Sequence, residues 1–434
     1  MGTSPSGRRM VCCNWKALDK SDDFEPACGN IQPATVSIDA ERMLSDTIGK
    51  QVLSEGITDP GQNMTQDSTN IPEQDNAERF FSANYAEARI RFVATAKKAG
   101  ASLLSYSIDE ETCPGLSIDI ATIGGSNAPT LLITSGVHGV EGYAGSAIQF
   151  ALLEQLMAND QFRKLRTVLI HAVNPYGFVH GRRVNEENVD LNRNFHASQE
   201  DYAGAPETYS RLDRFLNPTT RSRAFDLFYP QALLTIARYG QPALRQAVAG
   251  GQYAFPRGLF FGGKGPSRPA RIIQEHAASW LSGADGVLHL DLHTGLGSWG
   301  AAKMLLEPEE SRHAAWYAEN FGAETIVSGG QTGRSAYEAS GLFGLWMQRL
   351  FGKYHYRFAT LEFGTYPVLR VLQALRAENR AHHYSGPGKK DYAKSKAQLI
   401  ECFCPASPAW RSKVVQTGIH LIGRGYRAMS SGDS

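Results

Sequence analysis

The sequence of 434 residues has few cysteines, no long apolar run and no excess of charge of either sign. Its six cysteines have no C-x-x-C spacing, which is typical of reduced thiols in the cytoplasm. No run approaches the roughly 18 apolar residues that cross a bilayer, so we expect no transmembrane segment. Lys plus Arg is 44 and Asp plus Glu is 43, and this balance gives no electrostatic reason to expect nucleic acid as a partner. A G-x-S-x-G elbow is also absent, which argues against a serine hydrolase.

Residues 1–78 lack sustained hydrophobic periodicity. They are rich in Gly, Ser, Asp, Asn, Gln and Thr, which predicts a disordered extension. Arg8 and Arg9 have no apolar run behind them, so we expect no secretory signal. The first six residues match the loose pattern for N-myristoylation at Gly2, and Cys12 and Cys13 could carry a second acyl chain. Because that pattern is short, we favour an unmodified tail on a cytoplasmic protein.

From residue 79 onward, short apolar runs alternate with segments of helical spacing. The runs predict buried strands at 117–124, 130–136, 167–175, 287–293, 324–330 and 358–365. Strands that alternate with helices predict an α/β fold with a single mixed, mainly parallel sheet that helices cover on both faces. No linker or internal repeat divides this part, so we expect one catalytic domain over residues 79–434.

The first predicted helix of this domain is capped by Ser82 and ends at Lys98. Its spacing predicts one buried face, formed by Ala86, Ile90, Val93 and Ala94. Residues 196–270, in contrast, mix helix-like pieces with Gly and Pro, and no order of elements can be derived for them.

The stretch TLLITSGVHGVE, residues 130–141, joins a short apolar run to a histidine and a glutamate three residues apart. A strand that ends in a tight turn delivers the next side chains to the carboxyl edge of a sheet, where open α/β folds keep their sites. His138 and Glu141 are therefore a plausible pair of zinc ligands. Since such a pair is common by chance, the interpretation depends on three further stretches.

One of these is LDLHTG, residues 290–295, which His289 directly precedes. Alternation places His289, Asp291 and His293 on the same face of a strand. His293, at the strand end, is the natural third zinc ligand, and Asp291 could support it from behind. For His289 we favour a core residue with satisfied hydrogen bonds.

Another is ATLEFG, residues 359–364, where Glu362 ends an otherwise apolar strand. A glutamate is costly to bury without a partner, and a nearby metal ion with its water would provide one. Glu362 is therefore the candidate general base. In isolation, a glutamate that reaches solvent at the strand end is an equally good interpretation.

The remaining stretch is NPYG, residues 174–177, followed by GRRVNEENVDLNRNF, residues 181–195. Arginine suits the bidentate binding of a carboxylate and the stabilisation of an oxyanion. Taken alone, the stretch is better explained as a solvated basic loop whose charges are answered by Glu186 and Glu187. Its candidate site residues are Arg182, Arg183, Asn192 and Arg193.

In combination, these motifs resemble the zinc metallocarboxypeptidases of carboxypeptidase A type. The shared elements are H-x-x-E, an Asn-Arg pair within DLNRNF, a later strand-end histidine and a final strand-end glutamate. NPYG is similar to the family's N-P-D-G element, with Tyr176 in place of Asp. SGVHGVEG and RRVNEENVDLNRNF look most like an uncharacterised bacterial and fungal branch that is labelled only as a domain of unknown function.

The resemblance implies one Zn²⁺ ion bound by His138, Glu141 and His293, with one position left for water. Glu362 would take the proton of that water and pass it to the leaving amine. Asn192 and Arg193 would hold the terminal carboxylate of the substrate. The remaining implied contacts are an oxyanion contact from Arg183, less surely Arg182, and a capping tyrosine, Tyr337, in SAYEASG.

The motifs leave three interpretations open. The favoured one is a carboxypeptidase-like zinc hydrolase that cleaves an amide or peptide bond next to a carboxylate-bearing residue. DLHTG and HGVEG also resemble the aspartoacylase and succinylglutamate desuccinylase branch, which implies an N-acyl amino acid deacylase. The third is a binding protein with an inactive site, which is weaker because ligands, carboxylate clamp and base are all present. The expected substrate is a peptide or N-acyl amino acid with a free carboxylate.

Overall fold

The structure is a computed structural model that describes residues 74–159, 164–220, 226–328, 340–352 and 355–430. Within these ranges eight strands form one sheet, in the order β1-β2-β4-β3-β5-β8-β6-β7. Strands β4, β3, β5 and β8 run parallel at its centre, and β1, β2 and β6 add antiparallel pairings. The predicted α/β class with a mixed, mainly parallel sheet is therefore confirmed. The strands are β1 (Ser102–Ser107), β2 (Ser117–Ile123), β3 (Thr130–Ser135), β4 (Arg166–His171), β5 (Val287–Gly295), β6 (Ala302–Leu306), β7 (Ile326–Ser328) and β8 (Tyr356–Gly364).

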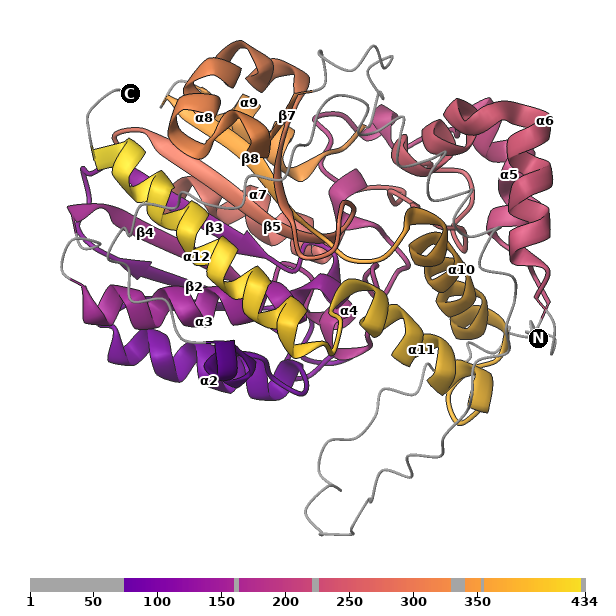
Figure 1. Cartoon of the computed structure of the whole chain (residues 1–434), viewed down its shortest axis with the longest axis horizontal. Coiled ribbons are helices and arrows are strands. Elements are labelled where there is room, and N and C mark those ends of the chain that lie inside the picture. The colour runs from indigo at the N-terminus through magenta and orange to yellow at the C-terminus, as the bar shows by residue number, and fades with distance from the viewer. Residues whose placement is uncertain (1–73, 160–163, 221–225, 329–339, 353–354, 431–434) are drawn as a thin grey trace, which may run out of the picture. The chain divides into compact units, whose positions relative to one another are not determined.

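Helices cover both faces of this sheet (Figure 1). On one face, α2, α3 and α12 contribute to the main hydrophobic core, which also contains the leucines of β5. On the other, Phe343 of α9 packs against His289 of β5, with ring centroids 5.5 Å apart. The helices are α2 (Tyr85–Lys98), α3 (Gly142–Ala158), α4 (Pro175–Val179), α5 (Glu207–Leu216), α6 (Phe228–Ala249), α7 (Arg268–Trp280), α8 (Ala314–Phe321), α9 (Phe343–Phe351), α10 (Val368–Tyr384), α11 (Lys390–Phe403) and α12 (Pro408–Ser430).

The central strands are continuous apolar runs because helices bury both of their faces. Every residue of β3, β4 and β5 is buried. Along β5, Leu288, Leu290 and Leu292 face the helical core, so the alternate positions face the opposite side of the sheet. That opposite side carries the polar residues of β5, and it therefore positions the site.

Two strands escaped prediction, β1 and β6. Both are only partly buried, and β1 lies at an edge of the sheet. Their sequences, SLLSYS and AKMLL, contain no β-branched residue, so they have little strand propensity of their own. Their strand conformation depends on pairing with β2 and β8, which lie elsewhere in the chain.

The predicted buried face of the first helix is wrong. Helix α2 is capped by Asn84, whose side chain accepts a hydrogen bond from the backbone of Glu87. Its buried face is formed by Tyr85, Ala88, Phe92 and Ala96, whereas Ile90 is 70% exposed. Two neighbouring apolar stripes compete on this helix, and the stripe with the two large aromatic rings packs inward because it removes more apolar surface from water.

Residues 196–270, for which no order of elements could be derived from the sequence, contain helices α5 and α6. Helix α6 includes Gly240, whose backbone is not helical. The predicted disordered extension lies largely outside the described residues, and a 3₁₀ helix, η2 (Gln74–Phe80), spans its expected end. The division at residue 78 stays a prediction.

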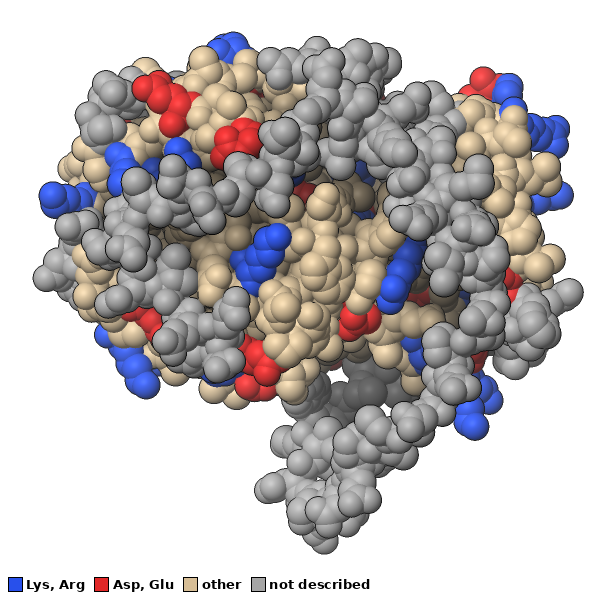
Figure 2. Space-filling view, in the orientation of Figure 1, with Lys and Arg blue, Asp and Glu red and all other residues tan. Residues whose placement is uncertain are grey.

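Figure 2 shows acidic and basic side chains interspersed over the face in view, as expected from balanced charge. None of the described helices combines the length and apolarity needed to cross a membrane.

Candidate active site

A glycine turn after β3 brings the first two predicted zinc ligands to the carboxyl edge of the sheet. Gly136 has a φ of 67°, in the left-handed region that favours glycine. The chain then enters a short 3₁₀ helix, η3 (Gly139–Glu141), which places His138 and Glu141 on the same side. The third ligand, His293, lies near the end of the neighbouring parallel strand β5. Parallel strands end at the same edge, so the two motifs meet.

The three side chains are arranged as a metal-binding group. Nδ1 of His138 lies 2.9 Å from one carboxylate oxygen of Glu141, and Nδ1 of His293 lies 3.0 Å from the other. The potential ligand atoms all fall within 4.8 Å of one another, and all three residues are buried. Two imidazoles and one carboxylate are a usual donor set for a catalytic zinc ion. The predicted ligands are thus brought together, and they fit Zn²⁺.

Each histidine has an aspartate behind it. Nε2 of His293 lies 2.7 Å from Asp291, as the strand alternation predicts. Nε2 of His138 lies 3.2 Å from Asp190, the first residue of DLNRNF, which was missed as a candidate site residue. For His293, an aspartate that accepts from the outer nitrogen keeps Nδ1 free to bind a metal. The signal for Asp190 was the motif itself, in which only the later residues were assigned roles.

The buried carboxylates of the site favour the binding of a cation. Burial alone would lower the pKa of His293, but Asp291 and Glu141 outweigh it and hold that pKa well above its ordinary value. Burial would likewise raise the pKa of Glu141, and His138 and His293 reverse this and lower it. In the absence of a metal ion the carboxylates therefore retain a proton on the histidine. A divalent cation would take over that role and release the proton.

The candidate base, Glu362, lies beside the third ligand. It pairs in register with His293 across β5 and β8, and it is 6% exposed. One carboxylate oxygen accepts a hydrogen bond from the backbone of Leu296 at 2.7 Å. Burial, helped by the charge of Glu141, raises the pKa of Glu362 to about 7, while His293 and that hydrogen bond act against the increase. Glu362 is buried at the site, so the solvent-facing interpretation does not hold.

Arg183 reaches the same group from the loop after α4. Its Nε donates to Asp190 at 2.9 Å, and Nη2 lies 2.6 Å from Nε2 of His138. Nη1 lies 3.6 Å from Glu141. The guanidinium therefore lies at the edge of the ligand group, where it contacts the side chains of three site residues.

A family model described as a protein of unknown function, DUF2817, matches residues 81–417. The chain belongs to the DUF2817 family. This confirms the resemblance to an uncharacterised branch labelled as a domain of unknown function. No protein with a curated description matches the chain.

Several solved structures are similar to this DUF2817 chain at low identity. Carboxypeptidase A from Helicoverpa armigera is 13% identical, with 83% of this chain and 81% of the other covered and a TM-score of 0.42. Bovine thrombin-activatable fibrinolysis inhibitor is 13% identical, with 79% and 98% covered and a TM-score of 0.39. Murein-tripeptide amidase MpaA from Escherichia coli O157 is 18% identical, with 64% and 92% covered and a TM-score of 0.32. Similarity at this level assigns neither substrate nor reaction to the DUF2817 chain.

The predicted carboxylate clamp lies next to the metal group in this DUF2817 chain. Arg193 is buried, and burial lowers its pKa while the neighbouring charge of Asp190 raises it. The side chain of Asn192 accepts from the backbone of Phe343 at 3.1 Å, which fixes this turn to the start of α9. The predicted capping residue, Tyr337, lies outside the described residues.

Arg182 is the one candidate that the fold carries away from the site. Its guanidinium is completely buried and pairs with Glu378 of α10 at 2.9 Å, with Asn188 and Asn379 as further acceptors. The backbone carbonyls of Arg182 and Arg183 both accept hydrogen bonds from the turn at η3, which holds this loop against the metal-binding group, while the two side chains contact different partners. Its expected oxyanion role is not supported by this position.

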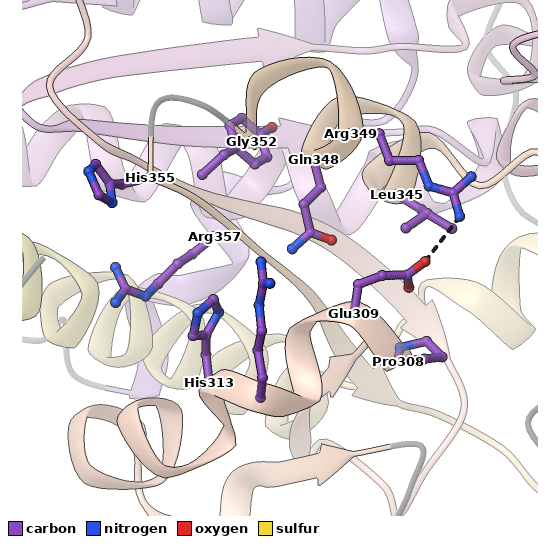
Figure 3. A pocket seen from close by; sticks show the side chains of 11 residues that line it. Pro308, Glu309, His313, Leu345, Gln348, Arg349, Gly352, His355 and Arg357 are labelled. Atoms are coloured by element: carbon purple, nitrogen blue, oxygen red, sulfur yellow. Dashed lines mark hydrogen bonds and ion pairs between the residues drawn. The ribbon is translucent and has the colours of Figure 1, made fainter.

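A cavity of about 610 Å³ lies near the start of β8, at the opposite end of that strand from Glu362 (Figure 3). Basic side chains dominate its wall, including Arg312 and Arg357, while its acidic residue, Glu309, pairs with Arg349 at 3.0 Å. No metal-site residue lines this cavity. It is therefore a feature separate from the candidate active site.

Proposed function

We propose that this DUF2817 protein is a zinc-dependent hydrolase that cleaves an amide or peptide bond next to a carboxylate-bearing residue. The observation that carries the proposal is the convergence of three metal-ligating side chains with a buried glutamate of raised pKa. Perturbed titratable groups beside a metal site are typical of catalytic centres, since chemistry near neutral pH needs them.

The ligands would be His138, Glu141 and His293. A zinc ion bound there supplies a Lewis acid that polarises a carbonyl and lowers the pKa of a water molecule to about 7. Glu362 would accept the proton of the attacking water and return it to the leaving nitrogen. Its buried position beside His293 excludes bulk water and favours release of the proton in the second step.

The arginines would bind the charged parts of the substrate. Arg183 touches the ligand group and is placed to stabilise negative charge that develops on the carbonyl oxygen. Arg193 and Asn192 would hold the free carboxylate next to the scissile bond, and a buried guanidinium binds such a group more strongly than an exposed one. An N-acyl amino acid would present the same amide and carboxylate, so the deacylase reaction uses the same residues.

The experiment that tests this function is product analysis by mass spectrometry. The purified protein is incubated with short peptides, their C-terminally amidated forms and N-acyl amino acids, with and without a zinc chelator. Loss of a C-terminal residue supports the carboxypeptidase reaction, and release of an acyl group supports the deacylase reaction. Both should stop with the chelator and in Glu362→Gln, but not in Glu309→Gln, an exposed glutamate on the wall of the separate cavity. Turnover that survives chelation and Glu362→Gln would overturn the proposal.

A further inference from the structure

Behind the metal ligand His293, a line of buried hydrogen bonds crosses three adjacent strands. Nε2 of His293 meets one oxygen of Asp291 at 2.7 Å, and the hydroxyl of Thr134 donates to the other at 2.5 Å. The same hydroxyl lies 2.8 Å from Nε2 of His289, and Nδ1 of His289 lies 2.7 Å from the hydroxyl of Tyr356. Thr134 belongs to β3, His289 and Asp291 to β5, and Tyr356 to β8.

Hydrogen-bond chemistry gives this line a single direction. Because Thr134 has one hydroxyl proton and donates it to the Asp291 carboxylate, it must accept from Nε2–H of His289. Nδ1 of a neutral His289 is then an acceptor, so Tyr356 donates its hydroxyl proton to it. Burial lowers the pKa of His289 to about 4, although Asp291 opposes the shift, which agrees with a neutral ring. Each link thus fixes the donor and acceptor of the next.

All members of the line are shielded from solvent. Thr134 and His289 are completely buried, Asp291 is 1% exposed and Tyr356 is 4% exposed. Thr134 and Asp291 are direct partners across β3 and β5, so the backbone ladder sets their separation. Water cannot replace a lost partner cheaply in such surroundings, and an unpaired group here costs more than on the surface.

We infer that Thr134, His289 and Tyr356 are positioning residues that orient Asp291 and, through it, the imidazole of His293 for metal binding. This inference deepens the proposed function and rests on its zinc site. With both carboxylate oxygens engaged, by Thr134 and by His293, the plane of Asp291 is fixed. His293 must then present Nδ1 toward Glu141 and the metal. His289 and Tyr356 hold the hydroxyl of Thr134 in the donating orientation.

The first test is a matched pair of variants at Thr134. Thr134→Val keeps the shape but removes the hydroxyl, whereas Thr134→Ser keeps the hydroxyl. Loss of such outer partners costs about 10–100-fold in metal affinity. We expect a loss in this range for Thr134→Val and near wild-type affinity for Thr134→Ser. Zinc affinity is measured by competition with a chromogenic chelator, and the visible spectrum of the Co²⁺-substituted protein reports the ligand geometry.

The second test moves outward along the line. Tyr356→Phe should lower zinc affinity several-fold, and His289→Gln, which keeps one donor and one acceptor, should bind zinc more tightly than His289→Leu. Tyr317→Phe is the matched control, because Tyr317 is also completely buried but its hydroxyl has no hydrogen-bond partner among the described residues. It should leave zinc affinity unchanged. Denaturant unfolding of the metal-free variants separates a loss of fold from a loss of metal affinity.

The outcomes distinguish this inference from the proposed function. If the wild-type protein binds zinc and Thr134→Val binds it equally well, with an unchanged Co²⁺ spectrum, the positioning role is overturned while the hydrolase proposal stands. Equal losses in Tyr356→Phe and Tyr317→Phe would also overturn it, since the effect would then be one of packing. A wild-type protein without zinc affinity would overturn both proposals. Graded losses from Thr134 to Tyr356, with rescue by Thr134→Ser, would support the inference.

Discussion

The adjacent residues Arg182 and Arg183 belong to two different groups of buried charges, one around Glu378 and one at the candidate metal site. The buried charges of the two groups are stabilised in opposite ways. Around Glu378, the carboxylate is held by two cations, Arg182 and Lys396. Burial would raise the pKa of Glu378, but these partners outweigh burial and lower it. At the candidate metal site, the charge of Arg183 does not balance the carboxylates near it, which are Glu141, Asp190 and Glu362. Asp291 adds a further carboxylate behind His293.

The difference separates a structural charge group from a functional one. The Glu378 group is closed toward a metal ion, because two cations already outweigh the charge of its one carboxylate. The metal site is open, since its pKa shifts show carboxylates that compete for protons in the absence of a cation. Arg182 and Arg183 are adjacent in sequence, yet they belong to different groups. A charged motif therefore has functional meaning only when its excess of charge faces a ligand.

The largest expected effect is at the open group. Glu362→Gln removes the proton acceptor but keeps the shape and the hydrogen-bond acceptor for Leu296. We expect turnover to fall by about 10²–10⁴-fold. Zinc content, measured by elemental analysis, should stay near one ion per chain, because Glu362 is not among the ligands. Normal turnover in this variant would break the comparison, since the raised pKa would then have no catalytic meaning.

The next largest effect is at the closed group. Glu378→Gln leaves Arg182 and Lys396 buried without their carboxylate, and breaking such a pair costs about 3–5 kcal/mol of unfolding free energy. Chemical denaturation measures this loss. The zinc affinity of the folded variant should be unchanged. A variant that kept its stability but lost zinc would show that the two groups are not independent.

A smaller effect should distinguish the arginines. Arg193→Ala removes a charged contact worth about 1.5–3 kcal/mol, so we expect KM to rise about 10–100-fold for carboxylate-bearing substrates. The corresponding amidated substrates should be little affected. Arg182→Gln is the control, with reduced stability and an unchanged KM. If Arg182→Gln instead raised KM selectively for carboxylates, the assignment of this arginine to the closed group would be wrong.

The smallest effect concerns acid stability. Burial, together with Lys396 and Arg182, lowers the pKa of His180 from 6.5 to about 4. The unfolded chain then binds more protons between pH 6.5 and 4, so stability is lost as the pH falls through this window. His180→Gln should flatten that slope by less than the ~1.4 kcal/mol per pH unit of a full proton, since the ring is partly exposed. Thermal unfolding of metal-free protein at several pH values measures it, and an unchanged slope would rule out this contribution.

Patterns close together in the sequence predicted much of the fold and the site. Six apolar runs predicted six of the strands. His138, Glu141, His293 and Glu362 were predicted as site residues because they follow β3 or lie near the ends of β5 and β8. This worked because central parallel strands are apolar throughout and end at one edge, so local patterns carry three-dimensional information. The prediction of the buried face of α2 failed because the local pattern carries too little information there. Both apolar stripes of this helix satisfy helical spacing, and the elements that α2 packs against, α3, α4, β1 and β2, select one of them.

By itself, the sequence determined the class of fold, the order of the central strands along the chain and the candidate ligands near their ends. Only the tertiary structure decided that Arg183 reaches the metal site while Arg182 pairs with Glu378, almost two hundred residues away. It also decided the roles of Asp190 and of the line from Thr134 to Tyr356. The physical reason is that the role of a buried polar group depends on the partner with which it forms a hydrogen bond or ion pair. Those partners lie on other strands and helices, where no local periodicity can indicate them.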